Sequence, residues 1–227
     1  KPATLVSVGG IAGLATLGFK VLRSSNEGAV TASVGGGIVG RVSGKGSIED
    51  CYNRGKVTDS TGKGTAAGIA GVAIDASVVL DISSCYSTGA LTGNTSSTWG
   101  IVGGLTGSTA LANCYYLEGT APKAARDKAD AADACSKTAE QMQNAMLAVT
   151  LNAKRQGANA PWGWKSDVND AYPNLTTGQA LVTSWAEVGA AQTEKELRAA
   201  NELSGSGTSD DPFAISTPRA LAWWAYQ

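Results

Sequence analysis

Residues 36–40 read Gly36-Gly37-Ile38-Val39-Gly40, and residues 48–58 read Ile48-Glu49-Asp50-Cys51-Tyr52-Asn53-Arg54-Gly55-Lys56-Val57-Thr58. Both pieces occur again in the chain. Variants of the first lie at residues 9–13, 67–71 and 103–107, and variants of the second lie at residues 82–92 and 111–116, with a degenerate copy at 21–31. A period of roughly thirty residues is typical of solenoid proteins, in which each repeat is one coil of a stack.

Each repeat contains short apolar pieces, β-branched residues and turns of Gly, Asn and Ser, without the apolar spacing of an amphipathic helix. One such coil cannot bury its apolar face alone, but coils stacked about 4.8 Å apart pair through their backbones and share a core. Crossovers between parallel strands are right-handed in nearly all proteins. The repeats therefore predict an all-β fold, a right-handed parallel β-helix (β-solenoid) of about four coils with helical capping segments.

Equivalent residues of successive coils form ladders in such a stack. We expect an inward ladder at the apolar residue of the glycine motif, formed by Ile11, Ile38, Ile69 and Leu105. Two further ladders are expected, one of Val21, Ile48, Ile82 and Leu111 and one of Val30, Val57 and Leu91, and the cysteines Cys51, Cys85 and Cys114 are expected to stack as a column. The motif glycines are expected at corners, where φ is positive or two backbones approach closely.

The cysteines could suggest a metal site, but each motif carries one cysteine, whereas a zinc site needs paired thiolates. Free cysteine behaves as a small buried hydrophobe, so we expect a packed column of thiols. Cys135 lies outside the array, and a disulfide between Cys114 and Cys135 stays open. The tyrosines after the cysteines are expected to point outward or to sit at a corner, where they would shield the coil edge or bind sugar; they are Tyr52, Tyr86 and Tyr115.

The composition excludes several classes of function. The 227 residues contain 18 Lys and Arg against 19 Asp and Glu, and a net charge of −1 gives no basic surface for nucleic acid. There is no histidine, which removes the commonest general base and the usual zinc ligand. Carboxylates remain, but those of the repeats do not recur at matching positions, which argues against a carbohydrate-acting enzyme. We therefore expect no catalytic residues, no cofactor and no metal.

The ends of the chain also carry information. No apolar run approaches the length of a membrane-spanning helix, so we expect no membrane insertion of this segment. Lys1 stands where an initiator methionine would be, and no signal-peptide pattern follows it, so we expect a piece excised from a longer protein.

Four segments are distinguished along the chain. Residues 1–120 hold the β-solenoid repeats, and residues 121–183 hold a polar loop or loose helix, a capping helix that begins with a capping box at Thr138, and a Trp/Tyr-Pro cap. Residues 184–203 form a connector helix with a second capping box, and residues 204–227 form a cap-like segment. Three aspartates of the loop are spaced as on a solvated helix face rather than as in a calcium loop; they are Asp127, Asp130 and Asp133.

The pattern G-G-I-x-G followed by I-x-x-C-Y-N-x-G-x-V-T resembles the GLUG-type repeat of bacterial surface and secreted proteins. That repeat occurs in large adhesins and in the non-catalytic part of some immunoglobulin A proteases. Residues 137–142, 151–152, 162–164 and 172–175 are similar to stretches that close such an array. The resemblance covers about half of the chain and implies an extracellular β-helical module without a defined activity. The zinc-binding motif of the proteases contains two histidines, so the catalytic role is not carried over to this chain.

The run of residues 204–224 resembles the opening of a GLUG-type array, although here it follows the coils. The first coil has no cap of its own, and an uncovered apolar coil promotes edge-to-edge association. We expect Phe213, Trp223 and Trp224 to pack on the first coil, either of the same chain or of a second chain. Packing on a second chain would give head-to-tail self-association through residues 204–227.

The sequence favours a non-enzymatic structural or adhesive module of an extracellular protein, either on the bacterial cell surface or secreted. It would act as a rigid spacer or as a binding face for an unidentified host or matrix protein or glycan. The alternative is a carbohydrate-binding or carbohydrate-acting β-helix that uses carboxylates. Ice binding is disfavoured because the threonines align in a single column, which consists of Thr31, Thr58 and Thr92.

Overall fold

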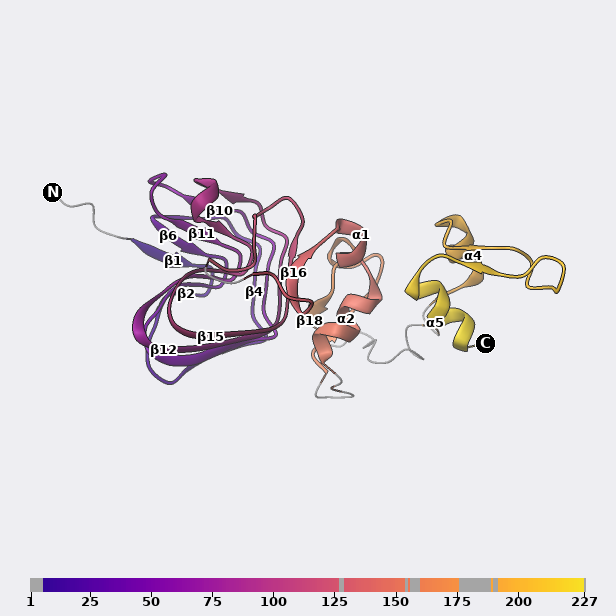
Figure 1. Ribbon diagram of the computed structural model, residues 1–227, viewed down its shortest axis with the longest axis horizontal. Helices are drawn as coiled ribbons and strands as arrows, with labels where there is room; N and C mark the ends of the chain where they lie inside the picture. The colour runs from indigo at the N-terminus through magenta and orange to yellow at the C-terminus, as the bar shows by residue number, and fades with distance from the viewer. Residues whose placement is uncertain are drawn as a thin grey trace. The chain divides into compact units, whose positions relative to one another are not determined.

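A computed structural model describes residues 6–126, 129–153, 155, 160–175, 189 and 192–226. The chain divides into two compact units, Lys1–Ala139 and Glu140–Gln227. The first unit consists of stacked parallel strands, and the second contains short helices and two antiparallel strand pairs (Figure 1). No helix in the described part of the chain is long and apolar enough to cross a membrane.

The first unit confirms the predicted parallel β-solenoid, with four strands in the sheet at which each coil begins. The first coil contains β1 (Ser7–Gly9), β2 (Ala12–Ala15), β3 (Phe19–Leu22), β4 (Ser25–Asn26) and β5 (Val30–Ala32). The second contains β6 (Val34–Gly36), β7 (Val39–Val42), β8 (Lys45–Glu49), β9 (Tyr52–Asn53) and β10 (Val57–Asp59). The third contains β11 (Thr65–Ala67), the long β12 (Ala70–Ser87) and β13 (Leu91–Thr92). The fourth contains the short 3-10 helix η1 (Thr95–Ser97), β14 (Thr98–Trp99) and the long β15 (Val102–Leu117).

The coils form one continuous core because the same position of each coil carries an apolar residue. Ile82 pairs with Ile48 of the coil before it and with Leu111 of the coil after it, and Ile48 pairs with Val21. In a third sheet Val57 pairs with Val30 and with Leu91. The largest fully buried aliphatic residues of this core are Ile38, Ile48, Ile69, Leu80, Ile82 and Ile101.

The ladder at the glycine motif corrects one expectation from the sequence. Ile11 donates its backbone N–H to the carbonyl of Ile38, Ile38 to that of Ile69, and Ile69 to that of Ile101, at 2.9–3.0 Å. The fourth member is therefore Ile101 and not Leu105, which pairs with Ala73 further along the coil. The physical reason is the strand register: Ala67 pairs with Trp99 and Ala70 with Val102, which places Ile101 next to Ile69.

The motif glycines allow close approach of two backbones. A Cβ atom on Gly37 would collide with the carbonyl oxygen of Gly68 and with the side chain of Asn53. The sharp corner before each stacked cysteine, and before Ser24 at the same place in the first coil, is made by other residues, which have φ near +50°: Arg23, Asp50, Ser84 and Asn113. Asp and Asn tolerate this left-handed conformation better than most residues with a side chain.

The stack continues beyond residue 120, where the sequence motifs end. The backbone N–H groups of Gly100 and Ile101 donate to the carbonyls of Lys123 and Ala124, both at 2.8 Å. The strand β16 (Ala134–Lys137) then pairs in parallel with the end of β15. The segment expected to be a polar loop or loose helix thus adds part of a fifth coil.

Asp130 has a role in this partial coil. Its carboxylate accepts hydrogen bonds from the Ala124 backbone N–H at 2.8 Å and from the Tyr116 hydroxyl at 2.9 Å. Asp133 is exposed, and Asp127 lies outside the described residues. Asp130 therefore stabilises the turn of the partial coil, which differs from the solvated helix face expected from the spacing.

The second unit begins with two short helices, α1 (Ala139–Met142) and α2 (Ala145–Asn152). The predicted helix is interrupted because the Asn144 side chain accepts a hydrogen bond from the Met146 N–H and starts a new helix. Trp162 is fully buried, and its backbone N–H and carbonyl bond to the side chain of Asn152. The other elements are β17 (Trp162–Gly163), η3 (Asn169–Ala171), β18 (Asn174–Leu175), α4 (Glu194–Ala199), β19 (Leu203–Ser204), β20 (Ala214–Ile215) and α5 (Pro218–Tyr226).

The C-terminal segment, residues 192–226, has a small core of its own. It begins at the predicted capping box, in which Thr193 and Glu196 bond to each other's backbone N–H. Leu197, Leu203, Ala220 and Trp223 are buried together, with Phe213 and Ile215 packed against them. Phe213 and Trp223 are thus used inside this segment, whereas Trp224 remains about half exposed, at 52%.

Candidate interaction surfaces

The cysteines of the three GLUG-like repeats form a column in the core. Cys85 pairs with Cys114, and Cys51 lies one coil earlier, because the neighbouring Tyr86 pairs with Tyr52. All three thiols are fully buried and free. Burial, together with the adjacent thiols of Cys114 and Cys51, raises the pKa of Cys85 well above its ordinary value. The Cys85 thiol is therefore a neutral packing group rather than a nucleophile, and Cys51 and Cys114 are packed beside it in the core.

Cys135 does not belong to this column. The register places it opposite Tyr115, and Ala134 lies opposite Cys114. Successive side chains of a strand point to opposite faces, so the Cys114 and Cys135 side chains point away from each other. Both cysteines are free. Within the described residues, no group of three or more cysteine, aspartate or glutamate side chains is placed to hold a metal ion.

A column of polar residues next to the cysteines was missed by the sequence interpretation. The Asn26 side chain donates to the Asn53 side-chain oxygen at 2.8 Å, and Asn53 donates to the Gly55 carbonyl at 2.9 Å and the Ser87 hydroxyl at 3.4 Å. Asn53 is fully buried. The recurring residue after Cys-Tyr was the available signal, and its role is to join neighbouring coils.

The tyrosine column is closed to ligands. The rings of Tyr52 and Tyr86 stack with 5.1 Å between their centroids and 3° between their planes. Tyr86 is fully buried, and Tyr52 and Tyr115 are buried as well. Burial raises the pKa of Tyr115 to about 12, helped by Cys135 and Asp133. The tyrosines were expected to point outward or to sit at a corner; the rings of Tyr52 and Tyr86 cover each other, and the burial of all three residues leaves no exposed tyrosine face for a sugar.

The first coil presents an open apolar face. Ile11 is 49% exposed, although its equivalents Ile38 and Ile69 in the next coils are fully buried. The difference arises because β1 to β5 pair with the second coil on one edge, and no other strand among the described residues pairs with their second edge. The exposed apolar residues of this face, called here the first-coil face, are Val6, Ile11, Leu14, Leu17 and Leu22.

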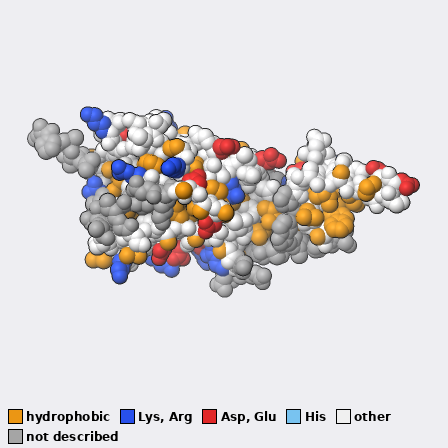
Figure 2. Space-filling view, viewed as in Figure 1, with side chains coloured by type: hydrophobic (Ala, Val, Ile, Leu, Met, Phe, Trp, Pro, Cys, Tyr) orange, Lys and Arg blue, Asp and Glu red, His pale blue; other side chains and the backbone are white. Residues whose placement is uncertain are grey.

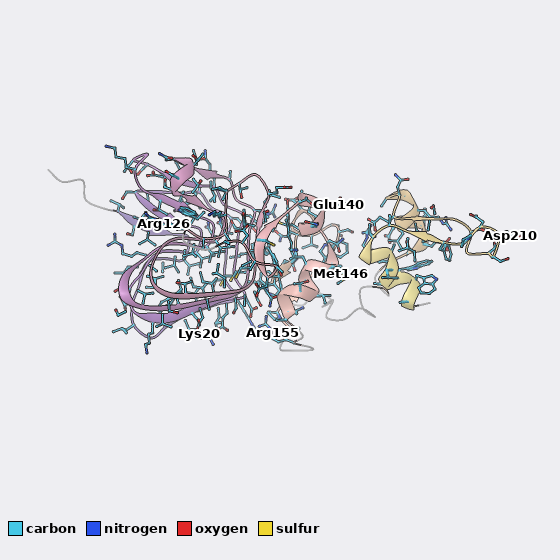
Figure 3. All side chains as sticks on the ribbon, viewed as in Figure 1. Lys20, Arg126, Glu140, Met146, Arg155 and Asp210 are labelled. Atoms are coloured by element: carbon cyan, nitrogen blue, oxygen red, sulfur yellow. The ribbon has the colours of Figure 1, made fainter. Side chains whose placement is uncertain are left out.

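Basic side chains border the first-coil face. Lys20 lies 3.5 Å from Glu49, and the Lys20 side chain is 55% exposed (labelled in Figure 3). Arg23 is exposed at the corner that follows β3. Salt bridges between exposed groups contribute little, so the positive charge of Lys20 remains available to a partner.

The C-terminal segment carries a second apolar surface. Hydrophobic side chains gather over its helices, and acidic side chains lie at the tip of the loop between β19 and β20 (Figure 2). A pocket of about 300 Å³ opens there, and Leu221 and Trp224 are 47% and 52% exposed. We call this surface the C-terminal face; its lining residues are Gly207, Pro212, Phe213, Ile215, Leu221 and Trp224.

Acidic residues stand beside the C-terminal face. Asp210 and Asp211 precede Pro212 in the loop, and both are exposed (Asp210 is labelled in Figure 3). Asp211 accepts a hydrogen bond from the Ser206 N–H at 2.8 Å, which fixes the loop. Asp210 and Asp211 thus give the loop side of the C-terminal face a negative border, and Arg198, whose guanidinium lies 5.8 Å from the centroid of the Phe213 ring, is paired with Glu194.

A polar pocket of about 400 Å³ lies elsewhere in the second unit, lined by Trp164, Ser166, Gln192, Glu196, Ala199, Ala200 and Arg219. Gln192 is 7% exposed, and its side-chain nitrogen has no hydrogen-bond partner among the described residues. Arg219 forms a bidentate pair with Glu202, with bonds of 2.9 and 2.6 Å. The lining of this pocket is therefore mostly polar, with Ser166, Gln192, Glu196 and Arg219 around it.

The coil formed by β6 to β10 is the one that a known family describes. Residues 32–58 match the GLUG motif. The match runs from the end of β5 into β10, so one GLUG motif forms one turn of the solenoid. The glycines of the motif lie where two backbones approach closely. Its Cys51, Tyr52 and Asn53 belong to the cysteine, tyrosine and polar columns described above. No curated protein matches the chain. Among solved structures, a putative immunoglobulin A1 protease from Bacteroides ovatus is similar with 22% identity and a TM-score of 0.47, over 69% of this chain and 57% of that chain. The aligned region thus covers little more than half of that structure's length.

Proposed function

We propose that the chain is a non-enzymatic structural module of a bacterial surface or secreted protein. The observation that supports this proposal is the continuous core of the first unit, in which buried ladders connect every coil with the next. The GLUG match supports an extracellular context, because the repeat resembles those of surface and secreted proteins. Such a core resists bending because each coil is held by its neighbours through backbone hydrogen bonds and close packing.

The size of the stack decides what kind of spacer it can be. Four coils about 4.8 Å apart give a height of only about 20 Å. A flexible linker of similar residue number would have an end-to-end distance of about 65 Å. A single module therefore gives little reach, and its contribution is to hold adjoining segments in a fixed orientation.

The test of rigidity is backbone relaxation measured by NMR. Order parameters near 0.85 are expected for the amides of β6 to β15, with low variation from coil to coil. Values below about 0.6 across one whole coil would contradict a rigid module.

The absence of enzymatic activity is tested by incubating the protein with a panel of polysaccharides. No release of reducing ends above the blank is expected. Release of reducing ends that disappears when a carboxylate is changed to an amide would show an enzyme instead.

The polar pocket favours a second candidate function, the binding of a saccharide unit. Its volume lies in the range of small-molecule sites, and its lining includes the Gln192 amide and the Ser166 hydroxyl beside apolar alanine methyl groups, with the Arg219 guanidinium already paired to Glu202. Hydroxyl groups of a sugar can satisfy both donors and acceptors of this kind.

This candidate is tested by titrating neutral monosaccharides and following binding by calorimetry. Gln192→Leu keeps the side-chain volume and removes the amide, so the affinity should fall at least tenfold. Gln143→Leu, at an exposed glutamine outside the pocket, is the matched control. Equal affinities for both variants, or no binding by the natural protein, would remove the candidate.

A further inference from the structure

We propose that the chain associates head to tail, with the C-terminal face of one molecule bound to the first-coil face of a second copy. The proposal goes beyond a rigid module and concerns what each module binds. It rests on two apolar surfaces that the same chain leaves exposed, each of them on a separate compact unit.

The first-coil face needs a cover for two reasons. Ile11 is 49% exposed, although its equivalents Ile38 and Ile69 in the later coils are fully buried, and Leu14 and Leu17 of the same coil are 56% and 78% exposed. The strands beneath them also have an unpaired edge, and exposed edge strands with apolar side chains are sites of association between chains.

The C-terminal face is suited to be that cover. Leu221 and Trp224 project from α5 beside a pocket of about 300 Å³, so an aliphatic side chain of a partner can enter it. Phe213 and Trp223 hold the pocket wall in place, with their rings edge to face and 5.8 Å between centroids. The surface is thus already formed before any partner arrives, which lowers the entropic cost of binding.

The charged residues beside the two faces favour a second copy of the chain as the partner of the first-coil face. Lys20 and Arg23 border the first-coil face, and Asp210 and Asp211 border the C-terminal face. Two first-coil faces would bring positive charges together, and two C-terminal faces would bring negative charges together. Only the pairing of unlike faces matches opposite charges, and it leaves one free face at each end, so open chains of modules form.

The pairing is tested with two double variants whose changed residues are exposed. Leu14→Asp with Leu17→Asp removes the first-coil face and introduces charges that repel Asp210. Leu221→Lys with Trp224→Lys removes the C-terminal face and introduces charges that repel Lys20. Val79→Asp, at a 37% exposed valine in the middle of the stack, is the matched control. Circular dichroism and amide exchange establish that each variant is folded.

Sedimentation of each protein between about 10 and 500 μM distinguishes the outcomes, a range around the Kd values of weak interfaces. The natural chain and the control should increase in average mass with concentration, and each double variant alone should stay at the mass of one chain. An equimolar mixture of the two double variants should give dimers and nothing larger, because one intact face remains on each. Raising the salt concentration should weaken the association.

Three results would overturn the proposal. The natural chain staying monomeric over the whole range would show that the faces do not bind in trans. Self-association of the Leu221→Lys/Trp224→Lys variant would show that two first-coil faces pair. Self-association of the Leu14→Asp/Leu17→Asp variant would show that two C-terminal faces pair.

Discussion

At the scale of single residues, the corner before each cysteine depends on a left-handed backbone conformation. Asn113 has φ of +51° at this corner in the fourth coil, and Asp50 and Ser84 occupy the same place in the second and third coils. A left-handed conformation costs an ordinary residue roughly 1–2 kcal/mol, and more for a β-branched one. The corner of each coil therefore carries a backbone strain that depends on the residue at this position. The repeats do not keep one residue type there: it is Asp50, Ser84 or Asn113.

We predict that Asn113→Val destabilises the protein by about 2 kcal/mol, because valine is poorly tolerated at positive φ. Ala112→Val, at the exposed neighbouring residue of the same strand, should change stability by less than about 0.5 kcal/mol, since β-branched residues suit strands. Urea unfolding followed by circular dichroism measures both. Similar losses for the two variants would mean that the left-handed corner is not the cause.

Asp59 fixes the loop between the second and third coils. Its carboxylate accepts hydrogen bonds from the Thr61 N–H at 2.9 Å, the Thr61 hydroxyl at 2.8 Å and the Gly64 N–H at 2.8 Å. Burial alone would raise the pKa of Asp59, but these hydrogen bonds outweigh burial and lower the pKa below its ordinary value of 3.8. The charged carboxylate is thus more favourable in the folded chain than in the unfolded chain.

The stability that Asp59 contributes is complete above the pKa of the unfolded chain and is lost as the pH falls through the lower pKa of the folded chain. Asp59→Asn should therefore cost about 1–2 kcal/mol at pH 7, and the difference from the natural protein should shrink as the pH falls below about 4. Urea midpoints at pH 7, 5, 4 and 3 test this. Asp81→Asn, at an exposed carboxylate of β12, is the control. A difference that stays constant down to pH 3 would contradict the assignment.

At the scale of elements, the three stacked cysteines are part of the core and one cysteine is outside it. Cys51, Cys85 and Cys114 are fully buried, and Cys135 on β16 is partly exposed. Thiol reagents attack the thiolate, which burial disfavours. One thiol per chain should therefore react quickly with a disulfide reagent at pH 8, and the other three should react only after unfolding in guanidinium.

The identity of the fast thiol is checked with Cys135→Ser, which should abolish the fast reaction and leave the stability nearly unchanged. Cys85→Ser places a hydroxyl in the apolar column, so it should destabilise the protein by about 1–3 kcal/mol. Two or more fast thiols in the natural chain would show that the column is open to solvent.

The repeats allowed the fold to be predicted because each coil carries its own copy of the same signal. The ladders of Ile48 and Val57 followed directly from that signal. Leu105 was misplaced because the glycine string around it resembles the motif in sequence, whereas the pairing of Ala67 with Trp99 and of Ala70 with Val102 selects Ile101. The partial fifth coil has no motif at all and is held by the long-range pairing of β16 with β15, which local patterns do not reveal.

The candidate surfaces were predicted less completely, for a related reason. An uncovered first coil follows from the repeat order, so the exposure of Ile11 could be expected. Which of the C-terminal aromatic residues is exposed depends on how the segment packs on itself. Phe213 and Trp223 are used in its core, and Trp224 is left at the surface. Only the three-dimensional packing distinguishes two adjacent tryptophans of one helix.

At the scale of the whole molecule, the described residues that form the core of the C-terminal segment all come from that segment. Trp223 is 6% exposed and is buried with Leu197, Leu203 and Ala220. Trp223→Ala should therefore cost about 3–5 kcal/mol, which a core of this size cannot withstand. Residues 192–226 should lose their protection from hydrogen exchange, and the strands β7 and β12 of the solenoid should keep theirs, because they belong to a different hydrophobic core.

Hydrogen exchange followed by mass spectrometry resolves this prediction segment by segment. Trp224→Ala is the matched control, since that tryptophan is 52% exposed on the same helix and its removal opens no cavity. Protection of residues 192–226 should survive in Trp224→Ala at the level of the natural chain. Equal loss in both variants would show that the buried ring is not what holds the segment together, and loss of protection in β7 or β12 with Trp223→Ala would show that the two units unfold as one.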